Sequence, residues 1–493
     1  MVLCLPLAIL LGFLLAQPLE LETLAVVVLV IAVLSVPLLM AWYHPLVILS
    51  WNAIVYFTFL PGQPELWMLM AVLALFFAAL NRSVDSDRRF IIVPELTRSL
   101  LFLVGVVLVT ALMTGGLGMR IFGGDRYGGR KYFYLFMAVA GYFAFCSQKI
   151  PKERANLFVA FFFLSSLTGL ISSLANAGGP GFYFLFNFFP PAGILDNPDA
   201  VVSQDYGIAR IGWLGSVAIS GASFILARYG IRGVLDLSRP WRLLLFLAAI
   251  VASLACGYRS NLILLLLIFG VLFVVEGLHR TRLLAGAAAC FVLCLCFLLS
   301  FAERLPPVVQ RTMSFLPIKV DPVVEVEAIA STEWRVGMWK SVLPLVPQYF
   351  FKGKGYGLDA NDLFLTGESS YRHLDDPFAG SRLAGDYHNG PLTVIIPFGI
   401  WGVIGFGWFV IASIRTMHRY CKFGDPELQK INRLLFAMFS AKVIFFLFVF
   451  GSLSSDLFTF TGLTGLAVSL NGLPRKSIEQ EQQIPGGAGE AFS

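Results

Sequence analysis

Charged residues are scarce in this chain of 493 residues. They make up 13% of it, whereas hydrophobic residues make up 57% and the mean hydropathy is +0.78. Soluble globular domains carry far more charge, so an array of soluble domains is excluded. In hydrocarbon every backbone N–H and C=O must be paired within the protein, and apolar runs this long and continuous are helical. We predict an all-α polytopic membrane protein with about 12–14 transmembrane helices.

Cysteine is scarce too, and its placement excludes other classes. The seven cysteines lie within or beside apolar runs, with no paired C-x-x-C units in a polar setting. The sequence therefore predicts neither a disulfide framework nor a zinc site, and we expect no metal and no cofactor. The net charge of +6 does not indicate a nucleic-acid partner, because the basic residues stand in short clusters at the ends of apolar segments.

Apolar segments of about the length of a membrane span recur along the chain. The first lacks a basic n-region and a convincing cleavage site, so we interpret it as a membrane helix that stays attached. The predicted spans are 2–17, 23–42, 45–60, 65–80, 98–117, 132–147, 156–175, 209–229, 243–257, 261–278, 283–302, 391–414, 434–453 and 457–472.

The Lys and Arg bias orients these spans. If the N-terminus is cytoplasmic, the connections at 82–98, 149–154, 232–242, 280–282 and 415–433 are cytoplasmic, and all five are basic. Residues 1–302 then form an N-terminal helix bundle, 303–390 a large extracytoplasmic loop, 391–472 the C-terminal spans and 473–493 a disordered cytoplasmic tail. The outer segment 118–131 is an exception to this cytoplasmic bias of basic residues, because it contains Arg120, Arg126, Arg130 and Lys131. These cations bind an anionic ligand or touch lipid head groups.

Two arginines stand at outer helix ends, where charge is costly. Arg259 follows the end of one predicted span and closely precedes the next, and Arg210 lies where an outer segment enters a span. Each either snorkels to the interface or faces a wet cavity that holds an anion. Because guanidinium groups bind phosphate oxygens bidentately and keep their charge, several of them here would suit a lipid-linked pyrophosphate.

The large loop contains two further motifs. Residues 331–346 place Trp334, Arg335, Trp339 and other apolar residues at helical spacing, which predicts an interfacial helix capped by Ser331 or Thr332. Arg335 would then add its charge to the positive end of the helix, or it forms a surface salt bridge. The alternating glycines of 353–357 predict a turn at the membrane surface, since the strand and helix of a nucleotide loop are missing.

Among the five histidines, His388 alone stands at the outer mouth of a following span. A neutral imidazole there could take a proton from a hydroxyl near neutral pH, with Asp386 or a backbone carbonyl setting its tautomer. A histidine before a helix is also commonly a capping or interface residue. The pattern therefore offers His388 as a candidate general base, with a purely structural role as the alternative.

These motifs together resemble the O-antigen ligase and O-antigen polymerase superfamily of bacterial envelope glycosyltransferases. The resemblance covers about residues 210–402 and includes Arg259-Ser260, a Trp-Arg-x-x-x-Trp segment at Arg335, the Gly-x-Gly-x-Gly stretch, and His388-Asn389 before a span. It implies multi-pass insertion in the bacterial inner membrane and a metal-independent inverting transfer. The implied donor is a saccharide linked to undecaprenyl pyrophosphate, and the acceptor is a hydroxyl of a glycan, a lipid A core or another molecule. Arg259, Arg335 and, as a weaker match, Arg210 correspond to pyrophosphate-binding residues, and His388 to the catalytic base.

Two alternatives belong to other classes. A transporter or flippase for lipid-linked or anionic solutes would use acidic residues within the membrane, for which Glu276 and Asp456 are the few candidates. A structural scaffold would leave the outward arginines and His388 without a role. Within the enzyme class, the sequence does not separate a polymerase from a ligase or a protein glycosylating transferase. The glycine- and arginine-rich segment 123–132 matches no motif of the resembled family.

Overall fold

The structure is a computed structural model that describes residues 21–60, 62–85, 90–117, 128–190, 210–358 and 376–473, together with Gly12 and Phe364. The described part is helical and contains no β-strand, only an isolated bridge between Tyr56 and Glu65. Its first nine α-helices are α2 (Leu21–Ser50), α3 (Leu66–Val84), α4 (Pro94–Thr114), α5 (Gly129–Phe145), α6 (Ala155–Leu164), α7 (Leu170–Gly178), α9 (Gly212–Val234), α10 (Trp241–Ala255) and α11 (Arg259–Val275). The others are α12 (Leu283–Phe301), α13 (Pro307–Met313), α14 (Pro322–Val342), α15 (Leu345–Tyr349), α17 (Ala379–Ala384), α18 (Gly390–Phe423), α19 (Gln429–Phe448) and α20 (Leu453–Asn471).

The protein is an all-α, multi-pass membrane protein, as predicted. Within the described residues, seven helical segments are long and apolar enough to cross a membrane, and four shorter apolar helices accompany them. The predicted separate spans 23–42 and 45–60 are wrong, because α2 continues through Pro37 and Pro45 to Ser50. An interior proline removes one hydrogen bond without ending a membrane helix when its neighbours support it. The predicted first span and almost all of the predicted tail lie outside the described residues.

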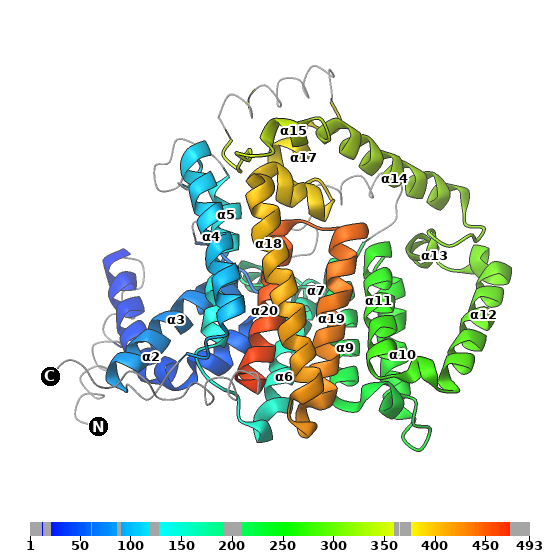
Figure 1. The fold of residues 1–493 in the computed structure, drawn as a ribbon, viewed down its shortest axis with the longest axis horizontal. Helices are drawn as coiled ribbons and strands as arrows, with labels where there is room; N and C mark the ends of the chain where they lie inside the picture. The colour runs from blue at the N-terminus through cyan, green and yellow to red at the C-terminus, as the bar shows by residue number, and fades with distance from the viewer. Residues whose placement is uncertain are drawn as a thin grey trace, which may run out of the picture.

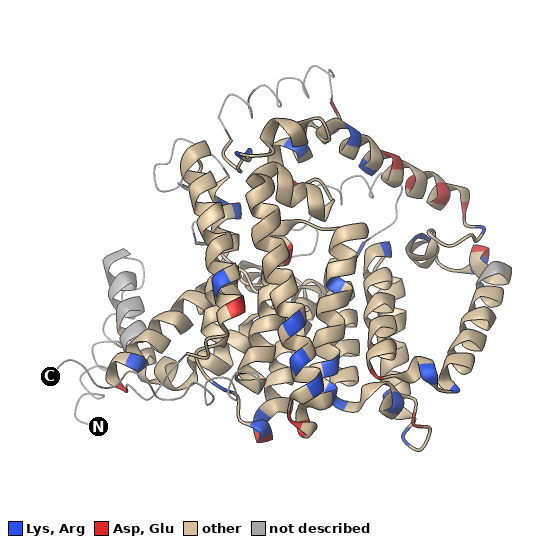
Figure 2. Ribbon diagram, in the orientation of Figure 1, with Lys and Arg blue, Asp and Glu red and all other residues tan. Residues whose placement is uncertain are grey.

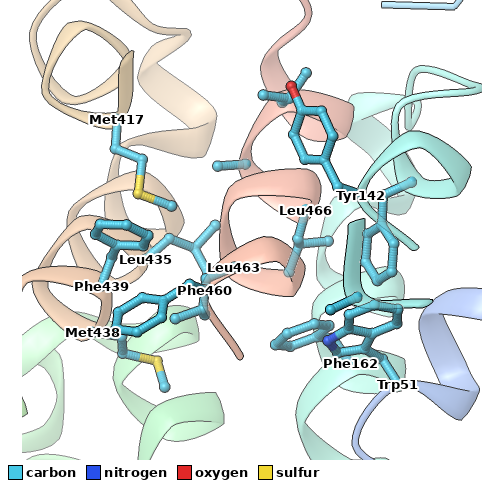
Figure 3. Close-up of a cluster of buried hydrophobic side chains, with 14 of the residues drawn as sticks. Trp51, Tyr142, Phe162, Met417, Leu435, Met438, Phe439, Phe460, Leu463 and Leu466 are labelled. Carbon is cyan, nitrogen blue, oxygen red and sulfur yellow. The ribbon is translucent and has the colours of Figure 1, made fainter. Parts of the chain in front are cut away.

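Helix α20 lies at the centre of the bundle. It is the most buried of the seven candidate spans, and Figure 3 shows its side chains between those of α18 and α19 on one side and aromatic rings on the other. Its small residues allow this close packing: a Cβ at Gly462 would lie 2.0 Å from Nε1 of Trp51. In a membrane, such packing replaces the hydrophobic drive as the source of helix association.

The helices α13, α14, α15 and α17 cover one end of the bundle, and we call this end the loop face (Figure 1). At the opposite end, the connections α9–α10 and α11–α12 and the adjoining turns of α18 and α19 carry many of the basic residues (Figure 2). Helix α18 begins at the loop face and extends 34 residues toward the other end. The chain therefore presents its mixed-charge segments on one face and a largely basic rim on the other, the asymmetry expected of an oriented membrane protein.

A short irregular segment, residues 350–357, holds the loop face onto α18, and we call it the strap. Helix α18 is broken at Gly399, whose φ is +61° and ψ −161°. The strap fills this break: the amides of Lys354 and Gly355 donate to the carbonyls of Ile396 and Pro397 at 2.8 and 2.9 Å. The glycines expected to form a surface turn therefore satisfy backbone groups of a broken membrane helix, which would otherwise be costly in hydrocarbon.

We predict that Gly353→Ala destabilises the protein by about 1–3 kcal/mol. Gly353 has a φ of +74°, and a Cβ there would lie 2.3 Å from the carbonyl oxygen of Pro397. The change should lower the Tm of the protein in detergent, measured by loss of the monodisperse peak after heating. Gly270→Ala is the matched control, because its Cβ meets open space within α11. Equal Tm values for the two variants would contradict the role of the strap.

Candidate functional site

A cavity of about 550 Å³ opens at the loop face and collects all four predicted site residues. Arg210 comes from the segment before α9, Arg259 from the start of α11, Arg335 from α14 and His388 from the residues before α18. The link between α19 and α20 adds Phe450 to the wall. Residues separated by almost 180 positions in the sequence therefore face one space.

His388 is held in a fixed position at the mouth of α18. The side chain of Asn389 caps this helix by accepting the amide of Leu392 at 3.1 Å. His388 itself has a φ of +49°, a conformation that few non-glycine residues adopt. Its ring contacts those of Trp334 and Phe450, at centroid distances of 5.5 and 5.1 Å, and only 9% of the residue is exposed. Asp386, one of the two groups predicted to orient the imidazole, lines the same cavity.

Helix α14 carries Arg335 but begins earlier than predicted. Asp321 caps it by accepting the amide of Val323 at 2.9 Å, and Pro322 occupies its first turn. The predicted cap at Ser331 or Thr332 is therefore wrong, and Arg335 lies in the second half of the helix, away from its positive end. Its guanidinium carbon lies 5.8 Å from the centroid of the Phe450 ring.

Aromatic contacts attach α14 to the segment that carries His388. The indole of Trp339 donates to the carbonyl of Tyr387 at 3.0 Å, and the indole of Trp334 donates to that of Pro377 at 3.3 Å. Below them, Met338 and Val342 pack with Tyr387 and two residues of α18 in a small apolar core. This core fixes Arg335 and His388 relative to each other.

Arg259 is the first residue of α11 and is half-buried. The preceding turn passes through Gly257, whose φ is +78°, so the chain reverses direction between α10 and α11 within four residues. The unpaired amides at the start of a helix carry a partial positive charge that favours an anion. The helix end that we expected beside Arg335 is therefore found beside Arg259.

Arg210 belongs to a buried ion network. Its Nη2 lies 2.8 Å from one oxygen of Glu327, and Nε of Arg311 lies 2.5 Å from the other. Burial alone would raise the pKa of the Glu327 carboxyl, but hydrogen bonds from Arg311 and Arg210 lower it below its usual value. Burial lowers the pKa of Arg311. The carboxylate thus stays charged and fixes both guanidinium groups at the edge of the cavity, where two arginines for one acid leave excess positive charge.

Two residues that line the cavity, Arg311 and Phe450, were not predicted from the sequence, and neither was the contact of Trp334 with His388. Arg311 lies in a short helix within the mixed-charge loop, where nothing in its neighbours distinguishes it from a solvated arginine. Phe450 ends an apolar run and looks like any membrane-facing residue. Trp334 was placed in the predicted interfacial helix, but its ring contact with His388, at a centroid distance of 5.5 Å, was not predicted.

The described cations of the segment 118–131 have partners within the protein. Lys131 donates to the carbonyl of Ala384 and lies over the Tyr356 ring, and Arg130 donates to the hydroxyl of Tyr134 at 3.2 Å. Lys131 thereby joins α5 to the residues before His388, a use that neither predicted alternative included. Arg120, Arg126 and the segment 123–127 lie outside the described residues.

The two acidic residues that could serve a transporter also have partners. Asp456 forms an ion pair with Lys442 at 2.7 Å and accepts the amide of Ser452 at 2.9 Å at the start of α20. Glu276 accepts the amide of Ile231 at 3.2 and 3.3 Å, beneath the bend at Gly230. Both carboxylates therefore act in the packing of helix ends.

Residues 243–407 match the family model described as O-Antigen ligase. The match supports the O-antigen ligase and polymerase superfamily. It covers about a third of the chain, from α10 to the middle of α18, and so includes Arg259, Arg311, Arg335 and His388, whereas Arg210 precedes it. A search of curated proteins found no match.

Proposed function

We propose that this protein is a glycosyltransferase of the bacterial inner membrane that ligates or polymerises saccharide linked to undecaprenyl pyrophosphate. The reaction takes place at the loop face, which is periplasmic in this proposal, during O-antigen or exopolysaccharide biosynthesis. The observation that carries the proposal is the cavity in which four arginines face His388. The O-antigen ligase match over the same elements supports it.

The arginines of the site act on the leaving group, and His388 acts on the acceptor. Arg259 and Arg335, with Arg210 and Arg311 at the edge, stabilise the charge that develops on the pyrophosphate as the bond from the anomeric carbon to its oxygen breaks. His388 takes the proton of the acceptor hydroxyl, whose oxygen forms the new bond to that carbon. One displacement inverts the anomeric configuration and releases undecaprenyl pyrophosphate. Since fixed guanidinium groups supply the positive charge, the proposed reaction is metal-independent.

The side chains around His388 prepare it for this role. The rings of Trp334 and Phe450 both contact the imidazole, and the cap of α18 fixes the backbone on which it stands. A base that is already positioned avoids the cost of ordering it in the transition state. The acceptor is a hydroxyl of a glycan, a lipid A core or another envelope molecule, and the reaction is the same for each.

A deletion strain tests the proposed function and separates its two forms. We expect the strain to lose its long surface glycan chains, measured by gel separation of envelope polysaccharide. Single units that still reach the acceptor identify a polymerase, whereas carrier-linked polymer that never reaches it identifies a ligase. Complementation with the wild-type chain is the control. A normal glycan profile would contradict the proposal and favour a transporter.

A further inference from the structure

A second cavity adjoins the candidate site. It has a volume of about 610 Å³ and is lined by residues 325–333 of α14, residues 314–320 and Glu303 just after α12. We call it the α14 groove. Arg259 lines both this groove and the cavity that contains His388. The two spaces therefore meet at the arginine that, under the proposed function, binds the pyrophosphate.

The cavity that contains His388 and the α14 groove are lined by residues of opposite net charge. The first cavity is lined by four arginines and one aspartate. The α14 groove instead carries three carboxylates, Glu303, Glu325 and Glu333, against Arg259 and Lys319. Figure 2 shows acidic residues along the half of α14 that lines the groove. The groove thus suits a different part of the substrate from the pyrophosphate.

The groove combines the chemical groups that bind sugars. Carboxylates accept hydrogen bonds from sugar hydroxyls, and Arg259 and Lys319 donate them. Ser314 and Thr332 donate to the carbonyls of Arg311 and Ala328 at 2.8 and 2.9 Å, so their hydroxyl oxygens add acceptors to the groove. Ile318 and Ile329 provide apolar surface for the C–H faces of a sugar ring. A lipid tail would meet too many carboxylates here, and a phosphate would meet net negative charge.

From these observations we infer that the α14 groove binds the saccharide of the lipid-linked donor and selects neutral or amino sugars over uronic acids. The inference rests on the proposed function and deepens it by naming the sugar class. With the pyrophosphate at Arg259, the attached saccharide lies beside the groove. A carboxylated sugar there would face Glu325 and Glu333, and this like-charge contact disfavours it.

Donors that differ only in sugar charge provide the test. The probes are polyprenyl pyrophosphates that carry either a neutral N-acetylglucosamine disaccharide or the same disaccharide with glucuronic acid as its second unit. The readout is the ratio of kcat/KM for the neutral donor to that for the acidic donor, because effects on the shared pyrophosphate cancel. We expect the wild type to prefer the neutral donor, and Glu325→Lys with Glu333→Lys to lower the ratio about five- to tenfold.

The control is Asp376→Lys, which reverses a charge on the loop face outside both cavities, where Asp376 pairs with Arg382. It should leave the ratio unchanged. An unchanged ratio in the double variant, with transfer retained, would overturn the inference and leave the proposed function standing. If the kcat/KM ratio changed with the charge of the acceptor and not with that of the donor, the assignment of the groove to the donor saccharide would be overturned.

Binding of the free disaccharides, measured by saturation-transfer NMR on the protein in detergent, separates the two proposals. If the wild type transfers neither donor, the proposed function fails. The groove inference then survives only if the neutral disaccharide binds more strongly than the acidic one and the double variant reverses that order. Equal binding of both disaccharides to the wild type and the double variant would overturn the inference as well.

Discussion

Replacing His388 with asparagine should lower the rate of glycan transfer about 10²–10⁴-fold while leaving the protein in the membrane at its normal amount. Asparagine tolerates the positive φ of this position and keeps a polar side chain, but it cannot take a proton from a hydroxyl near neutral pH. The measurement is surface glycan in a complemented deletion strain, together with transfer by the purified protein. His388→Ala should lower the rate of transfer to a similar extent.

The matched control is His418→Ala, since His418 lies toward the opposite end of α18 and packs against Phe436. It should support normal glycan assembly. The Tm of His388→Asn distinguishes lost chemistry from lost packing, because the contacts of the ring with Trp334 and Phe450 contribute to stability as well. Normal transfer by His388→Asn would remove this residue from the mechanism and make the packing of its ring with Trp334 and Phe450 its main role.

The sequence contains enough information to predict most of the described membrane helices and four of the residues that meet at the cavity. A membrane helix needs an apolar run, and a charge at its end is noticeable because the bilayer makes it costly. Arg259 and Arg210 could be found for this reason. His388 could be found because it is the only histidine at the mouth of an outer span.

Other features depend on tertiary contacts that a local pattern does not contain. The pairing of Glu327 with both Arg210 and Arg311 joins residues up to 117 positions apart, and no spacing rule connects them. The role of Gly353 could not be predicted either, since it depends on the break of α18 at Gly399. The start of α14 is different: Asp321-Pro322 is an ordinary helix-start signal, obscured by the aromatic pattern that follows.

Lysine in place of Arg259 or Arg335 should lower transfer about 10²-fold even though the charge is kept. An ammonium group cannot reproduce the planar fork that binds two oxygens of a pyrophosphate at once. Arg259 should be the more sensitive of the two, because it lines both cavities and stands at the positive end of α11. The measurement is kcat/KM for a lipid pyrophosphate donor, with membrane amount and Tm checked in parallel.

Arg382→Lys is the control for these two variants. Arg382 also lies on the loop face but pairs with Asp376 outside both cavities, so its replacement should leave transfer unchanged. The dependence of kcat/KM on salt concentration adds a second test. A contact made by a single screened ammonium group should weaken more with added salt than a bidentate contact made by a guanidinium group in a cavity. Full transfer by Arg259→Lys would favour the interface alternative, in which the side chain serves only to reach lipid head groups. Loss of transfer by Arg259→Lys with an unchanged Tm would instead mean that the reaction needs the guanidinium group itself. That group stands where the pyrophosphate cavity and the α14 groove meet.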